Sequence, residues 1–390
     1  GLSYQELNSL ANRFAWGLLE RGLKPQQWVV LEAPRSPHFL AALLGILKAG
    51  GVYVPLDPDG PAERRKRIVE QLPGALFLTA QAKEMAGCSH DPGCPSQGSD
   101  LAYLLFTSGS TGVPKGAMLE HAGLLNHLES KVEDFGLQPG VRVAQTAPAT
   151  FDISVWQLLA PLLGGACCCI FDDTLQRDPT QFMAQLRQHR VHILELVPAH
   201  IQALLNAPGE LPDLRYLLPT GEVLRPALCQ RWLERFPHTQ MVNAYGPTEC
   251  CDDVMLHFMT QVPDLSKASV PLGKPIKNVQ IRLLDQQLEE VPEGQLGEIC
   301  VGGVAVGRGY LHDAEKTAEA FVKHPVWGRI YRTGDLGCYQ QGELYFVERR
   351  DFQVKVRGVR LELGEVEAAL LQFEEVPEGQ LGEICVGGVA

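Results

Sequence analysis

The sequence predicts an α/β fold in which two lobes of mostly parallel sheets, covered by helices, precede a small antiparallel β-barrel or sheet. Three observations support this prediction. Helix-like and strand-like segments alternate up to about residue 250, a Ser/Gly-rich loop follows a buried strand, and glycine-rich strand–turn–strand units dominate after about residue 265. With 390 residues the chain is too long for one ordinary hydrophobic core, so we expect two or three lobes.

Several helices are marked by the residues at their starts. Ser3 and Glu6 have the spacing of a capping box, and an apolar stripe with helical period follows them to about Gly22. Ser-Pro at 36–37 and Asp-Pro at 178–179 each combine a capping side chain with a proline in the first turn. These signals predict three of the helices that cover the sheets.

Short apolar runs between the helical segments predict the strands. In the first part of the chain these runs are residues 28–31, 52–55, 75–79, 101–106, 141–146, 166–171 and 191–197. After about residue 265 we expect no further helices until the chain end, and antiparallel strands at 279–284, 297–301, 329–332 and 343–347. A strand at 353–357 and the start of a helix at 365–371 follow. In parallel sheets ligands bind beyond the carboxyl ends of the strands.

Charge and composition exclude several classes of protein. The net charge of −12 disfavours nucleic-acid and anionic-membrane partners, because basic surfaces usually bind both. No run of 18 apolar residues is present, so we expect no membrane span. The eleven cysteines form no Cys-x-x-Cys pair, which favours free thiols in a cytoplasmic protein over a metal or disulfide framework. Because the chain begins with Gly1, we expect it to be a piece of a longer protein.

The loop after the apolar run at 101–106 is the most informative feature. Its glycines let the backbone approach a ligand, its hydroxyls and N–H groups can donate hydrogen bonds, and Lys115 follows with a positive charge. This chemistry suits phosphate oxygens, although the spacing is not that of a Walker motif. The alternative interpretation is a plain Ser/Gly-rich surface loop. The candidate phosphate-binding residues are Thr107, Ser108, Gly109, Ser110, Thr111 and Gly112.

Together with this loop, the remaining motifs identify a family resemblance. They include Phe-Asp-Ile-Ser at 151–154, Asn-Ala-Tyr-Gly-Pro-Thr-Glu at 243–249 and Tyr-Arg-Thr-Gly-Asp-Leu at 331–336. The chain resembles the adenylation domains of nonribosomal peptide synthetases, within the adenylate-forming enzymes that also include acyl-CoA ligases and luciferases. The matching segments, in the order of the family, are 2–7, 47–57, 101–116, 151–154, 243–249, 297–303, 307–311, 331–336 and 349–358.

The resemblance implies a reaction and its partners. A carboxylate oxygen of an amino acid attacks the α-phosphorus of ATP, pyrophosphate leaves with Mg²⁺ assistance, and an aminoacyl-adenylate stays bound. A phosphopantetheine thiol on a carrier domain then accepts the acyl group. The implied partners are the carrier and condensation domains of the same synthetase. Such chemistry depends on positioning and on charge neutralisation.

The resemblance also assigns roles to residues. It implies that Thr248 contacts the α-phosphate and that Glu249 holds Mg²⁺. Tyr245 is expected to stack on adenine with Asn243 near the amino group of the base, and Asp335 to accept hydrogen bonds from the ribose hydroxyls. The expected catalytic residues are Lys115, Thr248, Glu249 and Arg349. Plain packing for Tyr245 and a turn role for Asp335 are the alternatives.

A substrate pocket is implied around Asp152, at the family position that pairs with the α-ammonium of an amino acid. The other implied pocket residues are Ile153, Trp156, Glu195, Leu218, Thr220, Ala244, Asp252 and Asp253. Three carboxylates in one cavity repel each other unless a cation lies between them. We therefore expect a cationic side chain on the substrate, and Trp156 beneath the pocket favours a short diamino acid. Alternatively, Asp252 and Asp253 cap or solvate a helix after Glu249.

The resemblance implies a domain division. We expect a core at 1–350, composed of α/β lobes at 1–264 and the β-rich lobe at 265–350, then a hinge at Asp351 and the start of a C-terminal lid at 351–373. The Asn-Gly-Lys motif of the family lid does not follow, so we expect slow adenylate formation.

Residues 374–390 repeat 289–305 letter for letter, which indicates an artefact of gene assembly. The alternatives to an adenylation domain are an acyl- or aryl-CoA ligase and an inactive fragment.

Overall fold

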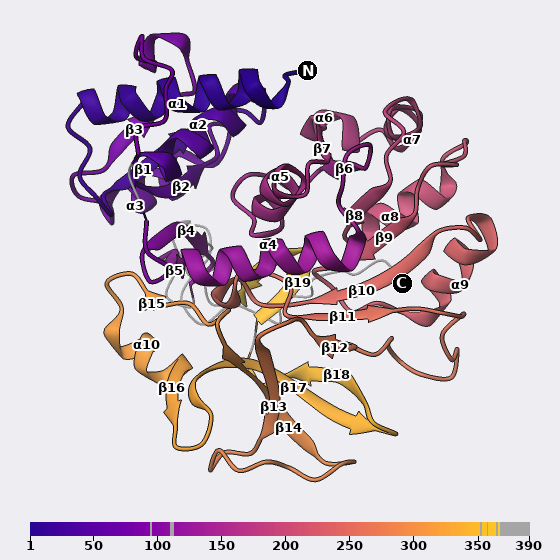
Figure 1. The fold of residues 1–390 in the computed structure, drawn as a ribbon. Helices are drawn as coiled ribbons and strands as arrows, with labels where there is room; N and C mark the ends of the chain where they lie inside the picture. Colours follow the sequence, from indigo (N-terminus) through magenta and orange to yellow (C-terminus); the bar gives the residue numbers. More distant parts are fainter. Residues whose placement is uncertain (94–95, 110–112, 352, 357, 364–365, 367–390) are drawn as a thin grey trace, which may run out of the picture.

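The computed structural model describes residues 1–93, 96–109, 113–351, 353–356, 358–363 and 366 (Figure 1). Within these residues the chain forms three larger sheets and one two-stranded hairpin. The N-terminal, six-stranded sheet has the order β15-β5-β4-β2-β1-β3. Its strands are β1 (Trp28–Glu32), β2 (Val52–Leu56), β3 (Leu76–Leu78), β4 (Leu101–Thr107), β5 (Lys115–Glu120) and β15 (Gly309–Tyr310).

Two amphipathic helices pack together beside this first sheet (Figure 1). They are α1 (Tyr4–Glu20) and α2 (Pro37–Lys48), and α3 (Ala62–Glu70) and a 3-10 turn (Ala82–Glu84) follow. The predicted capping box of Ser3 and Glu6 is present at the start of α1, and Ser36 caps α2 through the N–H of Phe39. Strands β1, β2, β3 and β4 are parallel, whereas β5 and β15 add antiparallel pairs at one edge.

The second sheet has seven strands in the order β12-β11-β10-β9-β8-β6-β7. Its strands are β6 (Arg142–Gln145), β7 (Cys167–Ile170), β8 (Ile193–Leu196), β9 (Tyr216–Pro219), β10 (Gln240–Tyr245), β11 (Met255–Phe258) and β12 (Lys274–Pro275). The helices around it are α4 (His121–Phe135), α5 (Ile153–Leu163), α6 (Asp173–Gln176), α7 (Pro179–Gln188), α8 (Pro198–Asn206) and α9 (Pro226–Arg235). Helix α4 contacts α5 and also β4 and β5, so it joins the first two sheets (Figure 1).

The third sheet is antiparallel, as predicted. Its strands are β13 (Val279–Leu284), β14 (Leu296–Gly303), β16 (Phe321–His324), β17 (Gly328–Gln340) and β18 (Glu343–Arg349). The prediction that no helix occurs in this part of the chain was wrong, because α10 (Ala314–Ala320) lies between β15 and β16 and is capped by Asp313. The hairpin of β19 (Gln353–Val356) and β20 (Val359–Glu362) follows. The expected helix at 365–371 and the repeat at 374–390 lie almost wholly outside the described residues.

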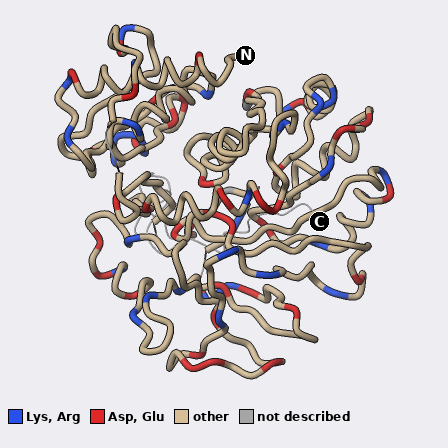
Figure 2. The backbone as a smooth tube through the Cα atoms, viewed as in Figure 1, with Lys and Arg blue, Asp and Glu red and all other residues tan. Residues whose placement is uncertain are grey.

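One hydrophobic core connects the three sheets. Its largest cluster of buried side chains includes Leu43 of α2, Val242 of β10 and Val301 of β14. Charged residues are spread along all parts of the chain and not gathered in one segment (Figure 2). The cysteines in the described part are free thiols. None of the described helices is both long and apolar enough to cross a bilayer.

Helices α1 and α2 pack so closely at Gly45 that a larger side chain there would collide with α1. A Cβ atom there would lie 2.6 Å from the Cβ of Phe14 and 2.8 Å from the carbonyl oxygen of Ala11. We predict that G45A lowers the free energy of unfolding by roughly 1–3 kcal/mol, because the two helices must separate. Urea denaturation measures the change. G87A is the matched control, since an added Cβ at Gly87 meets no atom within 4 Å; equal stability of the two variants would contradict the prediction.

Candidate active site

A cavity of about 720 Å³ lies where the carboxyl ends of β4 and β10 meet β17 and the β19–β20 hairpin. This position agrees with the rule for open α/β sheets, which places ligands beyond the carboxyl ends of strands. The predicted site residues that line it are Thr107, Ser108, Asp152, Ile153, Thr220, Asn243, Ala244, Tyr245, Thr248, Asp252, Asp335 and Arg349. Those that are described but do not line it are Gly109, Lys115, Trp156, Glu195, Leu218, Glu249, Asp253 and Asp351.

The Ser/Gly-rich loop begins at the end of β4, as predicted, and its residues 110–112 lie outside the described part. Gly109 is required by close packing, since a Cβ atom there would lie 1.9 Å from the carbonyl oxygen of Val113. The hydroxyl of Ser108 is buried and has no hydrogen-bond partner among the described residues. A buried hydroxyl without a partner costs free energy, which a ligand oxygen at this point would offset.

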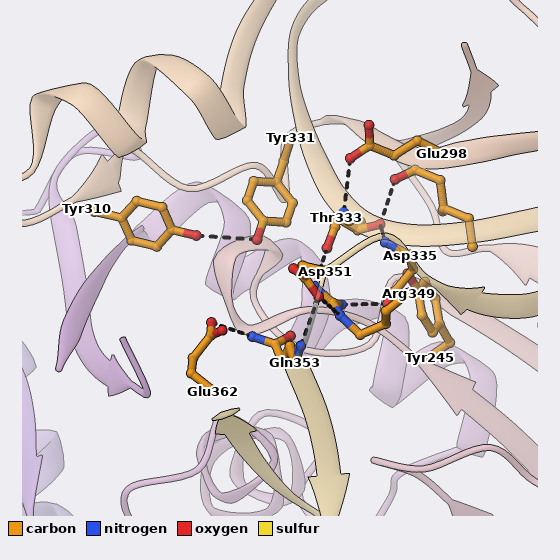
Figure 3. Close-up of polar contacts among 12 residues, drawn as sticks. Tyr245, Glu298, Tyr310, Tyr331, Thr333, Asp335, Arg349, Asp351, Gln353 and Glu362 are labelled. Carbon is orange, nitrogen blue, oxygen red and sulfur yellow. Dashed lines mark hydrogen bonds and ion pairs between the residues drawn. The ribbon is translucent and has the colours of Figure 1, made fainter. Parts of the chain in front are cut away.

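Lys115 is the first residue of β5 and contacts the β19–β20 hairpin and the ring of Tyr310. Its Nζ lies 3.4 Å from Oε1 of Glu362, which also accepts a hydrogen bond of 2.8 Å from the amide of Gln353 (Figure 3). The same ammonium lies 6.0 Å from the ring centroid of Tyr310, whose hydroxyl donates to Oε1 of Glu249 at 2.8 Å. Tyr310 therefore lies between Lys115, which is predicted to bind phosphates, and Glu249, which is predicted to hold Mg²⁺.

Asp335 lies at the centre of a second polar group (Figure 3). Its two carboxylate oxygens accept from the hydroxyl of Tyr245 at 2.6 Å and from Nη1 of Arg349 at 2.5 Å. The guanidinium of Arg349 also forms two hydrogen bonds of 2.7 Å with Asp351. The hydroxyl of Thr333 fixes the backbone by accepting from the N–H of Asp335 at 3.0 Å. The structure thus brings together the residues predicted to surround the nucleoside, and Asn243, whose amide donates to the Pro271 carbonyl, lines the same cavity.

Asp152 and Thr248 are in direct contact. The hydroxyl of Thr248 donates to Oδ2 of Asp152 at 2.5 Å, and Oδ1 accepts from the N–H of Ile153 at 3.0 Å, which ties the carboxylate to the start of α5. Burial raises the pKa of Asp152 above its ordinary value, and these hydrogen bonds counteract part of that effect. A cationic group in the cavity would stabilise the ionised carboxylate of Asp152, which burial disfavours.

Behind the cavity wall lies a buried group of carboxylates with one lysine. Nζ of Lys131 in α4 lies 2.6 Å from Oδ2 of Asp253, and both side chains are 1% exposed. The indole N–H of Trp156 donates to Oε2 of Glu195 at 2.6 Å, and the Lys131 ammonium lies 4.7 Å from the Trp156 ring centroid. Of the three acids expected to face one cavity, only Asp252 lines it, while Asp253 and Glu195 lie one layer deeper.

The charged side chains in this group shift one another's pKa values. Burial, followed by the charge of Asp253, raises the pKa values of Glu195 and Asp252 well above the ordinary range. Burial alone would depress the pKa of Lys131, but the charges of Asp253, Glu195 and Asp252 together raise it. Lys131 is therefore held as an ammonium inside the protein. Asp252 keeps one carboxylate oxygen without a hydrogen-bond partner among the described residues.

His127 and Lys131 were not predicted from the sequence. They lie one turn apart on α4, and Nε2 of His127 is 4.0 Å from Oδ2 of Asp252, too far for a hydrogen bond. Burial and the nearby Lys131 lower the pKa of His127 well below its usual value, so the imidazole is neutral. The signal in the sequence was a histidine and a lysine at i and i+4 on the same helix face as Leu124 and Leu128.

The capping interpretation of Asp252 and Asp253 was wrong. After Glu249 the chain makes only a one-turn 3-10 helix, Thr248–Cys250, and Cys251 and Asp252 then adopt left-handed backbone conformations before β11. Both carboxylates are buried, whereas a capping or solvating role would leave them at the surface. Both residues therefore lie in the protein interior, and Asp252 lines the cavity while Asp253 lies behind it.

Comparisons with known proteins agree with this geometry. The family described as "AMP-binding enzyme" matches residues 1–94 and 78–311. The chain is 37% identical over 398 residues to Tyrocidine synthase 2 of Brevibacillus parabrevis, an alignment that covers 97% of this chain and 11% of that protein. The chain therefore spans only about a tenth of that relative.

Two solved structures extend the comparison. Holo-AB3403, a four-domain nonribosomal peptide synthetase bound to AMP and glycine, superposes with a TM-score of 0.79 at 30% identity over 96% of this chain and 29% of that one. Holo-PA1221, which contains adenylation and PCP domains and carries a vinylsulfonamide inhibitor, superposes with a TM-score of 0.83 at 29% identity over 95% and 68%. This chain belongs to the AMP-binding enzymes, and within them to the adenylation domains of nonribosomal peptide synthetases.

The buried carboxyl of Asp252 should make the stability of the fold depend on pH. Its pKa in the folded state lies above the unfolded value, so the folded state loses stability as the pH rises through the folded pKa. We predict that D252N raises the free energy of unfolding by roughly 1–3 kcal/mol at neutral pH. The difference should vanish below about pH 4, where the carboxyl is protonated in both states. Denaturation at several pH values measures it.

D213N is the matched control for this experiment. Asp213 lies near the surface, and its hydrogen bond from Arg190 lowers its pKa, so its removal should slightly destabilise the protein at neutral pH. A D252N variant that is less stable than the parent protein at neutral pH would show that Asp252 is compensated in the folded state.

Proposed function

We propose that this chain activates an amino acid as its aminoacyl-adenylate, at the expense of ATP, and passes the acyl group to a phosphopantetheinyl carrier domain. The observation that carries the proposal is the single cavity with two chemically different ends. Tyr245, Asp335 and Arg349 line it and contact one another, and we assign them to the nucleotide end, while we assign Asp152 and Asp252 to the amino-acid end. Thr248 lines the same cavity and touches Asp152, which suits a residue at the junction of a nucleotide and an amino acid.

The residues at the nucleotide end suit the proposed roles. Asp335 can exchange its present partners for ribose hydroxyls, and Tyr245 presents an aromatic face to a base. Lys115 and Ser108 would hold phosphate oxygens. Glu249 shares Tyr310 with Lys115 and is the carboxylate we assign to Mg²⁺, which when bound would neutralise charge on the phosphates.

The partners follow from the relatives. AB3403 is a four-domain synthetase, and PA1221 contains a PCP domain beside its adenylation domain. We propose that this chain likewise works with a carrier domain, and with a condensation domain in the same synthetase. We further propose that residues 1–350 form the adenylation core and that Asp351, whose carboxylate is held by Arg349, marks the hinge.

For the substrate we propose an amino acid with a cationic side chain, and most specifically a short diamino acid. Asp152 would receive the α-ammonium, and the carboxylate of Asp252 would receive the ammonium of the side chain, since both residues line the cavity. Lys131 interacts with Asp253, Glu195 and Asp252, and Lys355 acts on Asp152, so these four acids still outnumber the two lysines. A further cation from the substrate would offset the remaining excess.

The alternative of an acyl- or aryl-CoA ligase is less well supported. A fatty or aryl acid carries no ammonium and would leave Asp152 and Asp252 buried without a counter-charge, which costs several kcal/mol per charge or forces protonation. Binding of CoA in place of a carrier domain would favour that alternative.

The role of Asp152 can be tested by binding. We predict that D152N weakens the binding of L-2,4-diaminobutyrate by at least about tenfold, because one buried ion pair is lost. Isothermal titration calorimetry with a non-hydrolysable ATP analogue present measures the dissociation constant without requiring turnover. D57N is the control, since Asp57 also lines the cavity but caps a turn through the N–H of Asp59. Equal affinities for D152N and the parent chain would overturn the assignment.

The proposed role of Asp335 can be tested by nucleotide binding. D335N should weaken the binding of AMPPNP by about tenfold, because an amide is a poorer acceptor than a carboxylate for two hydroxyl donors. Fluorescence titration measures the affinity, and the melting temperature reports whether the loss of the Arg349 contact disturbs the fold. D264N, in an exposed turn, should leave the affinity unchanged. Nucleotide binding that does not respond to D335N would place the ribose elsewhere.

A further inference from the structure

The buried lysine of α4 sits at the deep end of the proposed amino-acid pocket. Its ammonium forms the ion pair with Asp253 and lies over the ring of Trp156, and its charge also acts on Glu195 and Asp252. A surface lysine is ordinary, but a lysine side chain that is 1% exposed needs a reason, since the transfer of its ammonium from water is costly. Lys131 thus supplies inside the protein the same group that a long cationic substrate would bring.

We propose that Lys131 is a specificity-determining residue that limits the length of the substrate side chain. Its ammonium occupies the position at Asp253 that the ammonium of lysine or ornithine would otherwise reach. Of the acids around Lys131, Asp252, one residue earlier and part of the cavity lining, is then the one left to pair with a side-chain amine. This inference rests on the proposed substrate class, and it explains why that class is restricted to its short members.

The acids near Lys131 lie at two depths. Asp152 and Asp252 line the cavity, whereas Asp253, Glu195 and Trp156 lie behind it. Each of the two deep acids has one donor, Lys131 for Asp253 and the Trp156 indole for Glu195, and one oxygen without a partner among the described residues. Asp252 likewise has one buried oxygen without a donor, and the nearest imidazole nitrogen, on His127, is 4.0 Å away. An ammonium on a short side chain meets Asp252 first, because that residue lines the cavity, and a longer chain meets the Lys131 layer.

Removing Lys131 should change the length preference in a defined way. The parent 390-residue chain is expected to bind L-2,4-diaminobutyrate at least about tenfold more tightly than L-lysine, within the range that pocket size can discriminate. In K131A the space and the counter-charge at Asp253 become available together. We expect L-lysine and L-ornithine to gain at least about tenfold in affinity and L-2,4-diaminobutyrate to lose its advantage. Calorimetric titration of the four-member series from 2,3-diaminopropionate to lysine measures both changes.

The double variant K131A/D253N is the matched control. It opens the same space but removes the carboxylate, so L-lysine should show no gain from charge pairing, and its affinity should stay within about threefold of that for L-2,4-diaminobutyrate. The double variant removes both members of the Lys131–Asp253 ion pair, so neither is left without the other, and it stays testable if K131A is too unstable for titration. In K131A itself, saturating L-lysine should restore the melting temperature more than L-2,4-diaminobutyrate does.

The outcomes separate this inference from the proposed function. A parent chain that binds neutral amino acids and no cationic one overturns the proposed substrate class and this inference with it. A parent chain that binds short diamino acids, together with folded K131A and K131A/D253N that keep the same length preference, overturns only the role of Lys131. In that case the lysine serves to neutralise Asp253 within the fold.

Discussion

The ion pair of Lys131 with Asp253 is the interaction on which the organisation of the site depends. It joins α4, which packs against the first sheet, to the segment between β10 and β11 of the second. Buried pairs of this kind add little net stability, but the loss of one partner is strongly destabilising because the other charge remains in the interior. The pair therefore fixes how α4 lies against the wall of the cavity, and with it the positions of Asp252 and His127.

The other end of the cavity is held in a different way. Lys115 contacts Glu362. Arg349 bridges Asp335 and Asp351 (Figure 3), so the groups assigned to the nucleotide already have protein partners. A nucleotide bound as proposed would exchange these contacts for its own and would gain only the difference between the two sets. The contact between Lys115 and the β19–β20 hairpin would then be released, which couples the phosphates to the segment after Asp351.

The two ends of the cavity therefore differ in how their side chains are held. At the end that we assign to the amino acid, Asp253, Glu195 and Asp152 accept short hydrogen bonds from a lysine, an indole and a threonine. At the end that we assign to the nucleotide, the side-chain pairs come from the third sheet and the hairpin. Acids held in place by hydrogen bonds suit discrimination between similar side chains, while pairs that a ligand could replace suit one that arrives and leaves in each cycle.

Much of the fold and of the candidate site could be predicted from the sequence. The capping box of Ser3, the alternating apolar runs and the glycine-rich loop at Gly109 depend on neighbours within a few residues, and such local patterns are visible in a single chain. Motif order placed Asp152, Tyr245 and Asp335 in one site. Helix α10 was missed because a seven-residue helix with a weak apolar face leaves little periodic signal.

Only the tertiary structure decided which acids line the cavity. The sequence assigned Glu195, Asp252 and Asp253 to one cavity, but their depth depends on the left-handed backbone at Cys251 and Asp252 and on the packing of α4. The partner of Asp253 is 122 residues away along the chain. No local pattern reports such a contact, because the energy that keeps a lysine charged in the interior comes from acids brought together by the fold.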